Sequence, residues 1–154
     1  MSSPAGSPTR TTRSGAGTDE ARGMKEVLTV SDATKVAVLQ QLVDAFNRRD
    51  VEAAVALFSN EAVFDSSRGP DPWGRRFRGK VEIREGIRGR FEALPQGRYH
   101  DDSHFVCGDR GFSEYMLDAT TAAGVEVRVH GCDIWTFEGD RIVRKNSFWK
   151  IVEK

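Results

Sequence analysis

The chain has 154 residues, the length of one compact domain, and its 23 basic and 23 acidic side chains cancel. Balanced charge argues against a nucleic-acid partner, which a basic excess or stripe would favour. No apolar run approaches the ~20 residues of a membrane span, and the N-terminus lacks the apolar segment of a secretory signal. We therefore expect a cytoplasmic protein that binds neither nucleic acid nor membrane.

Residues 1–31 are expected to form a flexible N-terminal tail ahead of a domain over residues 32–154. The segment from Met1 to Gly23 has almost no large apolar side chain, so burial cannot offset the entropy of ordering it. Its Ser- and Arg-rich composition also has features of an organelle transit peptide, and Met24 is an alternative start. The interpretation we favour is a flexible extension or an over-long start.

Two helices are predicted at the start of the domain. Ser31 or Asp32 can cap the first, which ends near Arg49. Its apolar residues recur at spacings of three and four and form one face: Val36, Leu39, Leu42, Val43 and Phe46. Asp50 is expected to cap a second, shorter helix, which the pair Ser59-Asn60 breaks.

The middle of the chain predicts a short strand over residues 62–64, then a long loop over residues 66–79 with little periodicity. Long ordered loops in compact domains are often functional. We interpret the basic residues near its end, Arg75, Arg76, Arg78 and Lys80, as a solvated loop rather than a phosphate-binding surface. A third helix is expected over residues 80–94, because Pro95 cannot continue it.

Four strands are predicted in the last third of the chain, over residues 100–107, 111–119, 125–137 and 142–152, with turn signals between them. Helices followed by a strand meander indicate an α+β fold, with the helices on one face of a curved antiparallel sheet. Cys107 and Cys132 fall in these strands and lack zinc-ligand spacing. We interpret both as buried small hydrophobic residues in a reducing compartment rather than as a disulfide.

Four phrases of the sequence together resemble the nuclear transport factor 2-like superfamily, and the SnoaL-like proteins of unassigned activity within it. They lie at residues 42–50, 56–64, 77–80 and 132–142, with further likeness at 69–74 and 106–111. The resemblance implies an α+β cone in which three N-terminal helices pack on a curved antiparallel sheet that encloses a cavity. The same fold hosts isomerases, dehydratases, cyclases, hydrolases and binding proteins, so it does not determine the activity.

The resemblance also implies a homodimer that pairs through the outer face of the sheet. Side chains alternate between the two faces of a strand. The residues that this alternation places on the outer face are Glu114, Met116, Asp118, Arg128, His130 and Ile134.

Asp133 is the main catalytic candidate. By resemblance to ketosteroid isomerases, it falls where those enzymes keep a protonated Asp that donates to an oxyanion, and a carboxyl group in an apolar pocket suits general acid–base work. The same match points Lys145, Ser147 and Trp149 into the cavity. We expect an internal ion pair between Asp133 and Lys145 on neighbouring strands. A purely structural pair, or a Lys on the surface, is the alternative.

Other residues are expected to form the walls of the ligand cavity. Tyr115 and Leu117 share the apolar face of their strand, where Tyr115 orients a ligand or is simply part of the core. Trp73, in the long loop, is expected to cover the cavity mouth.

Two positions depart from the isomerase pattern. Ser66 stands where ketosteroid isomerases carry their proton-shuttling Asp, and Leu42 stands where they carry their oxyanion Tyr. The neighbouring Asp65 faces the opposite side unless a bulge shifts the register. Proton shuttling by that machinery is therefore not expected, although Ser66 still counts as a ligand-binding candidate.

The histidines do not suggest a metal site. His100 and His104, four residues apart with Asp102 between them, are expected to share an exposed or interface face of the sheet, and a dehydratase-like polar cluster is the alternative. His130 is expected to point outward. The sequence has no phosphate-binding glycine loop, so neither a metal nor another cofactor is expected.

The leading hypothesis is a cofactor-free acid–base enzyme of the cyclase, isomerase, dehydratase or hydrolase type, acting on a small, largely apolar metabolite. The alternative, which Ser66 favours, is a non-catalytic ligand-binding or dimerisation module.

Overall fold

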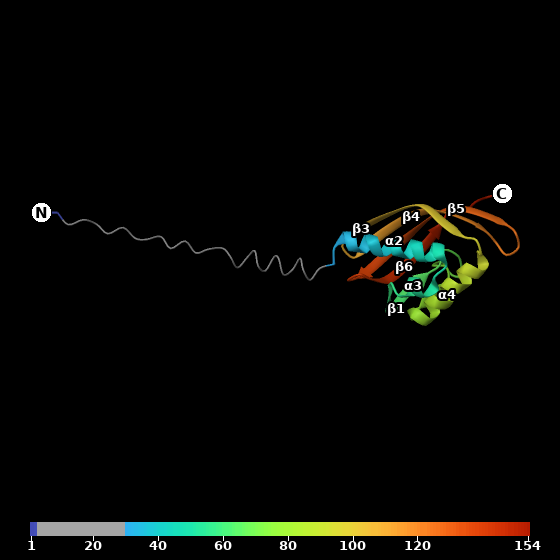
Figure 1. The fold of residues 1–154 in the computed structure, drawn as a ribbon, viewed down its shortest axis with the longest axis horizontal. Helices are drawn as coiled ribbons and strands as arrows, with labels where there is room; N and C mark the ends of the chain where they lie inside the picture. Colours follow the sequence, from blue (N-terminus) through green and yellow to red (C-terminus); the bar gives the residue numbers. More distant parts are fainter. Residues whose placement is uncertain (3–29) are drawn as a thin grey trace.

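The computed structural model describes residues 1–2 and 30–154. The predicted flexible tail falls almost wholly on residues 3–29 and so lies outside the described residues. Three helices, α2 (Asp32–Arg48), α3 (Val51–Val55) and α4 (Gly79–Ala93), pack against a single curved sheet (Figure 1). In the described part, α2 lies along β3 (Arg98–Cys107), and α4 lies against β1 (Phe58–Asp65). The predicted α+β class is confirmed.

Six strands form the sheet, in the order β2-β1-β6-β5-β4-β3. The other strands are β2 (Arg76–Arg78), β4 (Arg110–Thr120), β5 (Glu126–Glu138) and β6 (Arg141–Trp149). The predicted C-terminal meander is present, but the sheet is not wholly antiparallel, because β1 pairs in parallel with β6. Parallel neighbours need a long crossover, and the chain between β1 and β6 supplies one.

The predicted helix caps are present. The Oγ atom of Ser31 accepts the N–H of Thr34 at 3.1 Å, and the carboxylate of Asp50 accepts the N–H of Ala53 at 3.0 Å. The short helix α3 ends before the predicted break, and β1 begins at Phe58 rather than at residue 62. The pair Ser59-Asn60 therefore belongs to a strand, because Phe58 is fully buried and pairs with β6.

Part of the predicted loop is ordered as a strand. In β2, Arg76 pairs with Asp65 at the end of β1. The Arg76 guanidinium binds both Asp65 carboxylate oxygens, at 2.6 and 2.9 Å, and Arg144 adds a contact of 2.9 Å. Burial raises the pKa of Asp65, but these hydrogen bonds outweigh it and hold that pKa below its usual value. The solvated-loop interpretation is therefore wrong for Arg76, which binds a fully buried carboxylate.

A bulge in β3 changes which side chains face the helices. The register with β4 shifts between His100 and Ser103, and Asp101 has a φ of 51°. An extra residue in one strand reverses the alternation beyond it. Tyr99 therefore faces inward before the bulge, and His104 faces inward after it. The expectation that His100 and His104 share a face is wrong.

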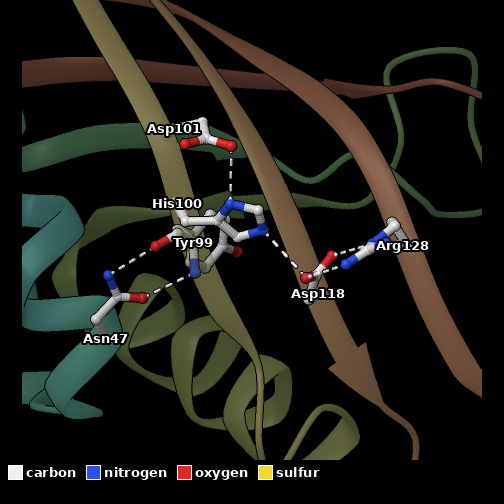
Figure 2. Close-up of polar contacts among 6 residues, drawn as sticks. All are labelled: Asn47, Tyr99, His100, Asp101, Asp118 and Arg128. Atoms are coloured by element: carbon white, nitrogen blue, oxygen red, sulfur yellow. Dashed lines mark hydrogen bonds and ion pairs between the residues drawn. The ribbon is translucent and has the colours of Figure 1, made fainter.

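His100 remains on the outer side of the sheet. Figure 2 shows its ring between the carboxylates of Asp101 and Asp118, each 3.1 Å from a ring nitrogen. Asp118 also binds Arg128 of β5, which lowers the pKa of this carboxyl group to about 2. These groups form a surface network, away from the interior.

Two apolar clusters fill the space between helices and sheet. The larger one joins α2, α3 and α4 to β1, β5 and β6: Val38, Leu39, Leu42, Ala45, Phe46, Ala54, Val55, Phe58, Ala62, Phe64, Ile83, Ile87, Trp135, Phe137 and Ile142. The smaller one comprises Leu94, Tyr115, Leu117, Ala119 and Val129.

Both cysteines are free among the described residues. Cys107 is exposed, which corrects the expectation that both are buried, and Cys132 is half-buried. In residues 1–2 and 30–154, no helix combines the length and apolar character needed to cross a membrane.

Candidate functional site

An ion pair lies inside the sheet on the hairpin of β5 and β6. Trp135 pairs with Lys145 and Asp133 pairs with Ser147, so Asp133 and Lys145 are diagonal neighbours on the inward face. The Asp133 Oδ2 and Lys145 Nζ atoms are 3.1 Å apart, and each side chain is 8% exposed. The predicted internal pair is thus present, and the alternative of a surface Lys is wrong.

Aromatic rings and one hydroxyl group surround the Lys145 ammonium. The Nζ atom lies 4.7 Å from the ring centroid of Phe64 and 5.2 Å from that of Trp135, and it donates to Ser147 Oγ at 2.5 Å. Burial lowers the pKa of Lys145, although Asp133 acts in the opposite direction. This ammonium therefore gives up its proton more readily than a solvated one.

Tyr115 connects the pair to Trp149. The Tyr115 hydroxyl donates to Asp133 Oδ1 at 3.3 Å and accepts the indole N–H of Trp149, also at 3.3 Å. Burial, assisted by the Asp133 charge, raises the pKa of Tyr115 far above its usual range. Tyr115 is therefore a neutral hydrogen-bond donor at any working pH.

A second polar chain reaches the same region from β3. The His104 ring lies between Asp102 Oδ2, at 2.9 Å, and Ser113 Oγ, at 2.7 Å, and Trp135 Nε1 donates to that Ser113 oxygen at 2.8 Å. The His104 side chain is 4% exposed. These contacts satisfy groups that would otherwise be costly to bury.

The hollow beside these groups is small. It measures about 20 Å³, room for roughly one water molecule. Its lining comes from α2, β3, β4, β5 and β6: Leu42, Val43, Phe46, Tyr99, Ser113, Tyr115, Asp133, Trp135 and Lys145. The interior is nearly filled, so a metabolite does not fit beside Asp133 with the side chains as they stand.

A much larger groove of about 450 Å³ opens nearby, where β1 and β6 end and β5 begins. Pockets of 300–1,000 Å³ typically hold small organic ligands. It is lined by Phe64, Ser66, Arg68, Arg75, Phe77, Glu85, Gly86, Gly89, Arg90, Ala93, Leu94, Thr121, Val127 and Trp149. Phe64 and Trp149 therefore wall the groove and also contact the ion-pair region, because Phe64 lies against Lys145 of β6 and Trp149 donates to Tyr115 of β4.

The predicted ligand-binding residues other than Trp73 lie in three different places: the groove, the hollow and the buried core. Ser66 and Trp149 line the groove, and Tyr115 lines the hollow. Ser147 is buried against Lys145, and Leu117 is fully buried in the smaller apolar cluster.

Two further positions, Trp73 and Asp65, lie outside both the hollow and the groove. Trp73 is 48% exposed and lies 5.2 Å from the Arg76 guanidinium, outside the lining of both the groove and the hollow. Asp65 is held by its two arginines on the face opposite to Phe64 and so does not replace the base that is absent at Ser66.

Sequence reasoning missed two groups, Arg90 and the chain of His104 and Ser113. Arg90 follows Ile83 and Ile87 at helical spacing on α4, and a basic residue on an apolar helix face is a signal that could have found it. The inward turn of His104 depends on the β3 bulge, which no local pattern predicts. Among the described residues, no three His, Cys, Asp or Glu side chains gather to hold a metal ion.

The fold and the site together define an α+β cone of the nuclear transport factor 2-like kind: helices on one face of a curved, unclosed sheet, with polar groups between them. The family model of the SnoaL-like domain matches residues 39–145. The chain therefore belongs to the SnoaL-like family. No curated protein matches the sequence.

Solved structures show the same fold. A proposed polyketide cyclase from Xanthomonas campestris pv. campestris aligns with a TM-score of 0.69 and 18% identity, covering 77% of this chain and 92% of its own. A proposed isomerase from Bacillus subtilis aligns with a TM-score of 0.68 and 18% identity, covering 79% of this chain and 90% of its own. An NTF2-like protein of unknown function from Burkholderia pseudomallei aligns with a TM-score of 0.67 and 20% identity, covering 76% of this chain and 91% of its own. At these identities the likeness is one of fold.

Proposed function

We propose that this protein binds a small, largely apolar organic molecule in the groove and carries out a cofactor-free acid–base step on it. The observation that carries the proposal is the buried pair of Asp133 and Lys145, which adjoins the groove through Phe64 and Trp149. Ionisable groups in such surroundings are candidates for catalysis. The descriptions of structural relatives as a proposed polyketide cyclase and a proposed isomerase support cyclisation or isomerisation as the reaction class.

In this proposal Asp133 transfers the proton and Lys145 is its electrostatic partner. A positive charge in a site with little water stabilises negative charge that develops on a substrate oxygen. Tyr115 orients the Asp133 carboxylate through its hydroxyl group. Because the hollow is so small, a reacting group in the groove has to displace a side chain to reach Asp133, and Phe64 and Trp149 of the groove wall are the candidates. Ser66 and Leu42 take no part in proton shuttling, since neither carries an ionisable group.

A non-catalytic ligand-binding module is the second candidate. The small hollow favours it, because Asp133 and Lys145 satisfy each other in a nearly filled interior. Buried ion pairs also occur as structural features. In this case the groove binds its ligand, and the ion pair serves only the packing of the hairpin.

Native mass spectrometry of the purified protein, followed by extraction, would identify a bound compound, which is then assayed for turnover. We expect Asp133→Asn to lower kcat by about 10²- to 10⁴-fold and to leave binding largely intact. Glu114→Gln, on the outer sheet face, is the matched control and should behave as the wild type. Turnover and binding both unchanged in Asp133→Asn would exclude the catalytic assignment. A wild type that binds the compound and does not turn it over would favour the binding module.

A further inference from the structure

Three arginines line the groove and take no part in the acid–base pair. They are Arg68, Arg75 and Arg90, and the single acidic residue in the lining is Glu85. Five other arginines of the described part of the chain have carboxylate partners within 4.0 Å, and six do not; the five are Arg76, Arg84, Arg88, Arg128 and Arg144. Within residues 30–154, no such partner is found for the three groove arginines. The groove therefore carries positive charge that the described part of the chain does not neutralise.

Arg90 is the best placed of the three. Its guanidinium lies 4.5 Å from the ring centroid of Trp149 and donates to Ser66 Oγ at 3.3 Å. Arg90 is half-buried, whereas Arg68 and Arg75 are exposed. The contact with the Trp149 ring places the guanidinium at the wall of the groove.

The rest of the groove lining is largely apolar. Phe64, Phe77 and Trp149 contribute aromatic surface, and Leu94, Ala93 and Val127 contribute aliphatic surface. This combination suits a flat, unsaturated body that carries one anionic group. A guanidinium presents parallel N–H donors that match the two oxygens of a carboxylate.

We infer that the groove takes an aromatic or otherwise unsaturated carboxylate, with the carboxylate on Arg90 and the apolar body against Phe64, Phe77 and Trp149. Arg68 and Arg75 at the rim add long-range attraction for the anion. The inference deepens the proposed function and rests on it, because it names the chemical class of the ligand. It also assigns Arg90 as the residue that determines this specificity.

The test compares 2-naphthoate with its neutral analogue 2-naphthamide by isothermal titration calorimetry at low salt. We expect the wild type to bind the naphthoate at least about tenfold more tightly, as for a charge-assisted pair worth about 1.4 kcal/mol. Arg90→Met should remove this preference and leave the affinity for the amide unchanged. Arg88→Met is the control, because Arg88 lies on the same helix, is 57% exposed and does not line the groove.

Two further variants make the test independent of the folding of Arg90→Met. Arg90→Lys keeps the charge and loses the paired donors, so we expect it to retain part of the preference. The double variant Arg68→Met/Arg75→Met removes two exposed charges at the rim of the groove. We expect it to weaken naphthoate binding roughly two- to threefold, because the long-range attraction for the anion is lost.

The outcomes separate this inference from the proposed function. Equal affinity of the wild type for both probes, or an unchanged preference in Arg90→Met, would overturn the carboxylate assignment and leave ligand binding in the groove standing. If neither probe binds with a Kd of about 1 mM or below, which corresponds to a binding free energy of roughly 4 kcal/mol, both the carboxylate assignment and the proposed ligand binding in the groove would be overturned.

Discussion

The Cα atom of Gly131 lies so close to the Tyr115 ring that a Cβ atom there would be 2.6 Å from Cε2 and 2.9 Å from the hydroxyl oxygen. The two residues pair directly across β4 and β5. Glycine at this position thus makes room for the ring that orients Asp133.

The substitution Gly131→Ala should therefore displace Tyr115 and break its hydrogen bond to Asp133. We expect a loss of about 1–3 kcal/mol in the free energy of unfolding, the usual cost of overpacking, and a changed near-ultraviolet circular dichroism spectrum. Gly89→Ala on α4 is the control, because an added Cβ there meets nothing within 4 Å. Gly89→Ala should leave the free energy of unfolding unchanged or raise it, since alanine is the better helix former. An unchanged spectrum in Gly131→Ala would contradict the packing described here.

Removal of one member of the buried ion pair should cost more than removal of both. Asp133→Asn or Lys145→Met alone leaves a charge without its partner, and we expect each to lower the free energy of unfolding by about 3–5 kcal/mol. The double variant should be less destabilised than the sum of the two, with a coupling energy of about 1–3 kcal/mol. Urea denaturation of the four proteins measures this cycle. Strict additivity would mean that the two groups do not interact.

The lowered pKa of Lys145 predicts a dependence of stability on alkaline pH. Burial lowers this pKa in the folded chain, and the unfolded chain keeps the ordinary value of about 10.4. Between the two values the unfolded state binds more protons, so the contribution of Lys145 to the free energy of unfolding rises with pH. The difference between wild type and Lys145→Met should therefore grow in favour of the wild type as the pH rises toward 10.4. Parallel pH profiles of the two proteins would refute this prediction.

Asp65 is expected to matter for stability and not for ligand binding. It is fully buried and accepts three hydrogen bonds from Arg76 and Arg144. Asp65→Asn should lower the free energy of unfolding by about 2 kcal/mol, because hydrogen bonds between charged groups are lost while both arginines remain partly solvated. The affinity for 2-naphthoate should stay within about twofold of the wild type, as for a site without direct contact. A large loss of binding without a loss of stability would instead place Asp65 in the site.

We also predict a homodimer through the outer face of the sheet. This face exposes three large apolar side chains, Phe105, Phe112 and Phe148, at 62%, 37% and 47%. Contiguous apolar surface of this kind marks interaction sites. Light scattering should give twice the mass of one chain, and Phe148→Ser should shift the population toward monomer. Val81→Ser, which changes an exposed apolar residue of α4, is the control. A monomeric wild type at working concentration would exclude the dimer.

Local patterns were sufficient for much of the architecture. The side chains of Ser31 and Asp50 cap their helices as expected, because a cap depends on residues within one turn. The facing of Asp133 and Lys145 followed from strand alternation and from a short turn between neighbouring strands. The resemblance to ketosteroid isomerases supplied the choice between the two possible faces.

The sequence by itself determined the α+β class, the helix starts and the C-terminal meander, because each depends on short-range periodicity. The internal ion pair also required the family resemblance, because periodicity leaves open which face of a strand points inward. The tertiary structure alone decided the parallel pairing of β1 with β6 and the β3 bulge that turns His104 inward. It also decided the binding of the Asp65 carboxylate by Arg144. It also brought Arg90 of α4 against Trp149 of β6. These features join segments far apart in the chain, and such contacts depend on how helices and sheet pack rather than on any local pattern.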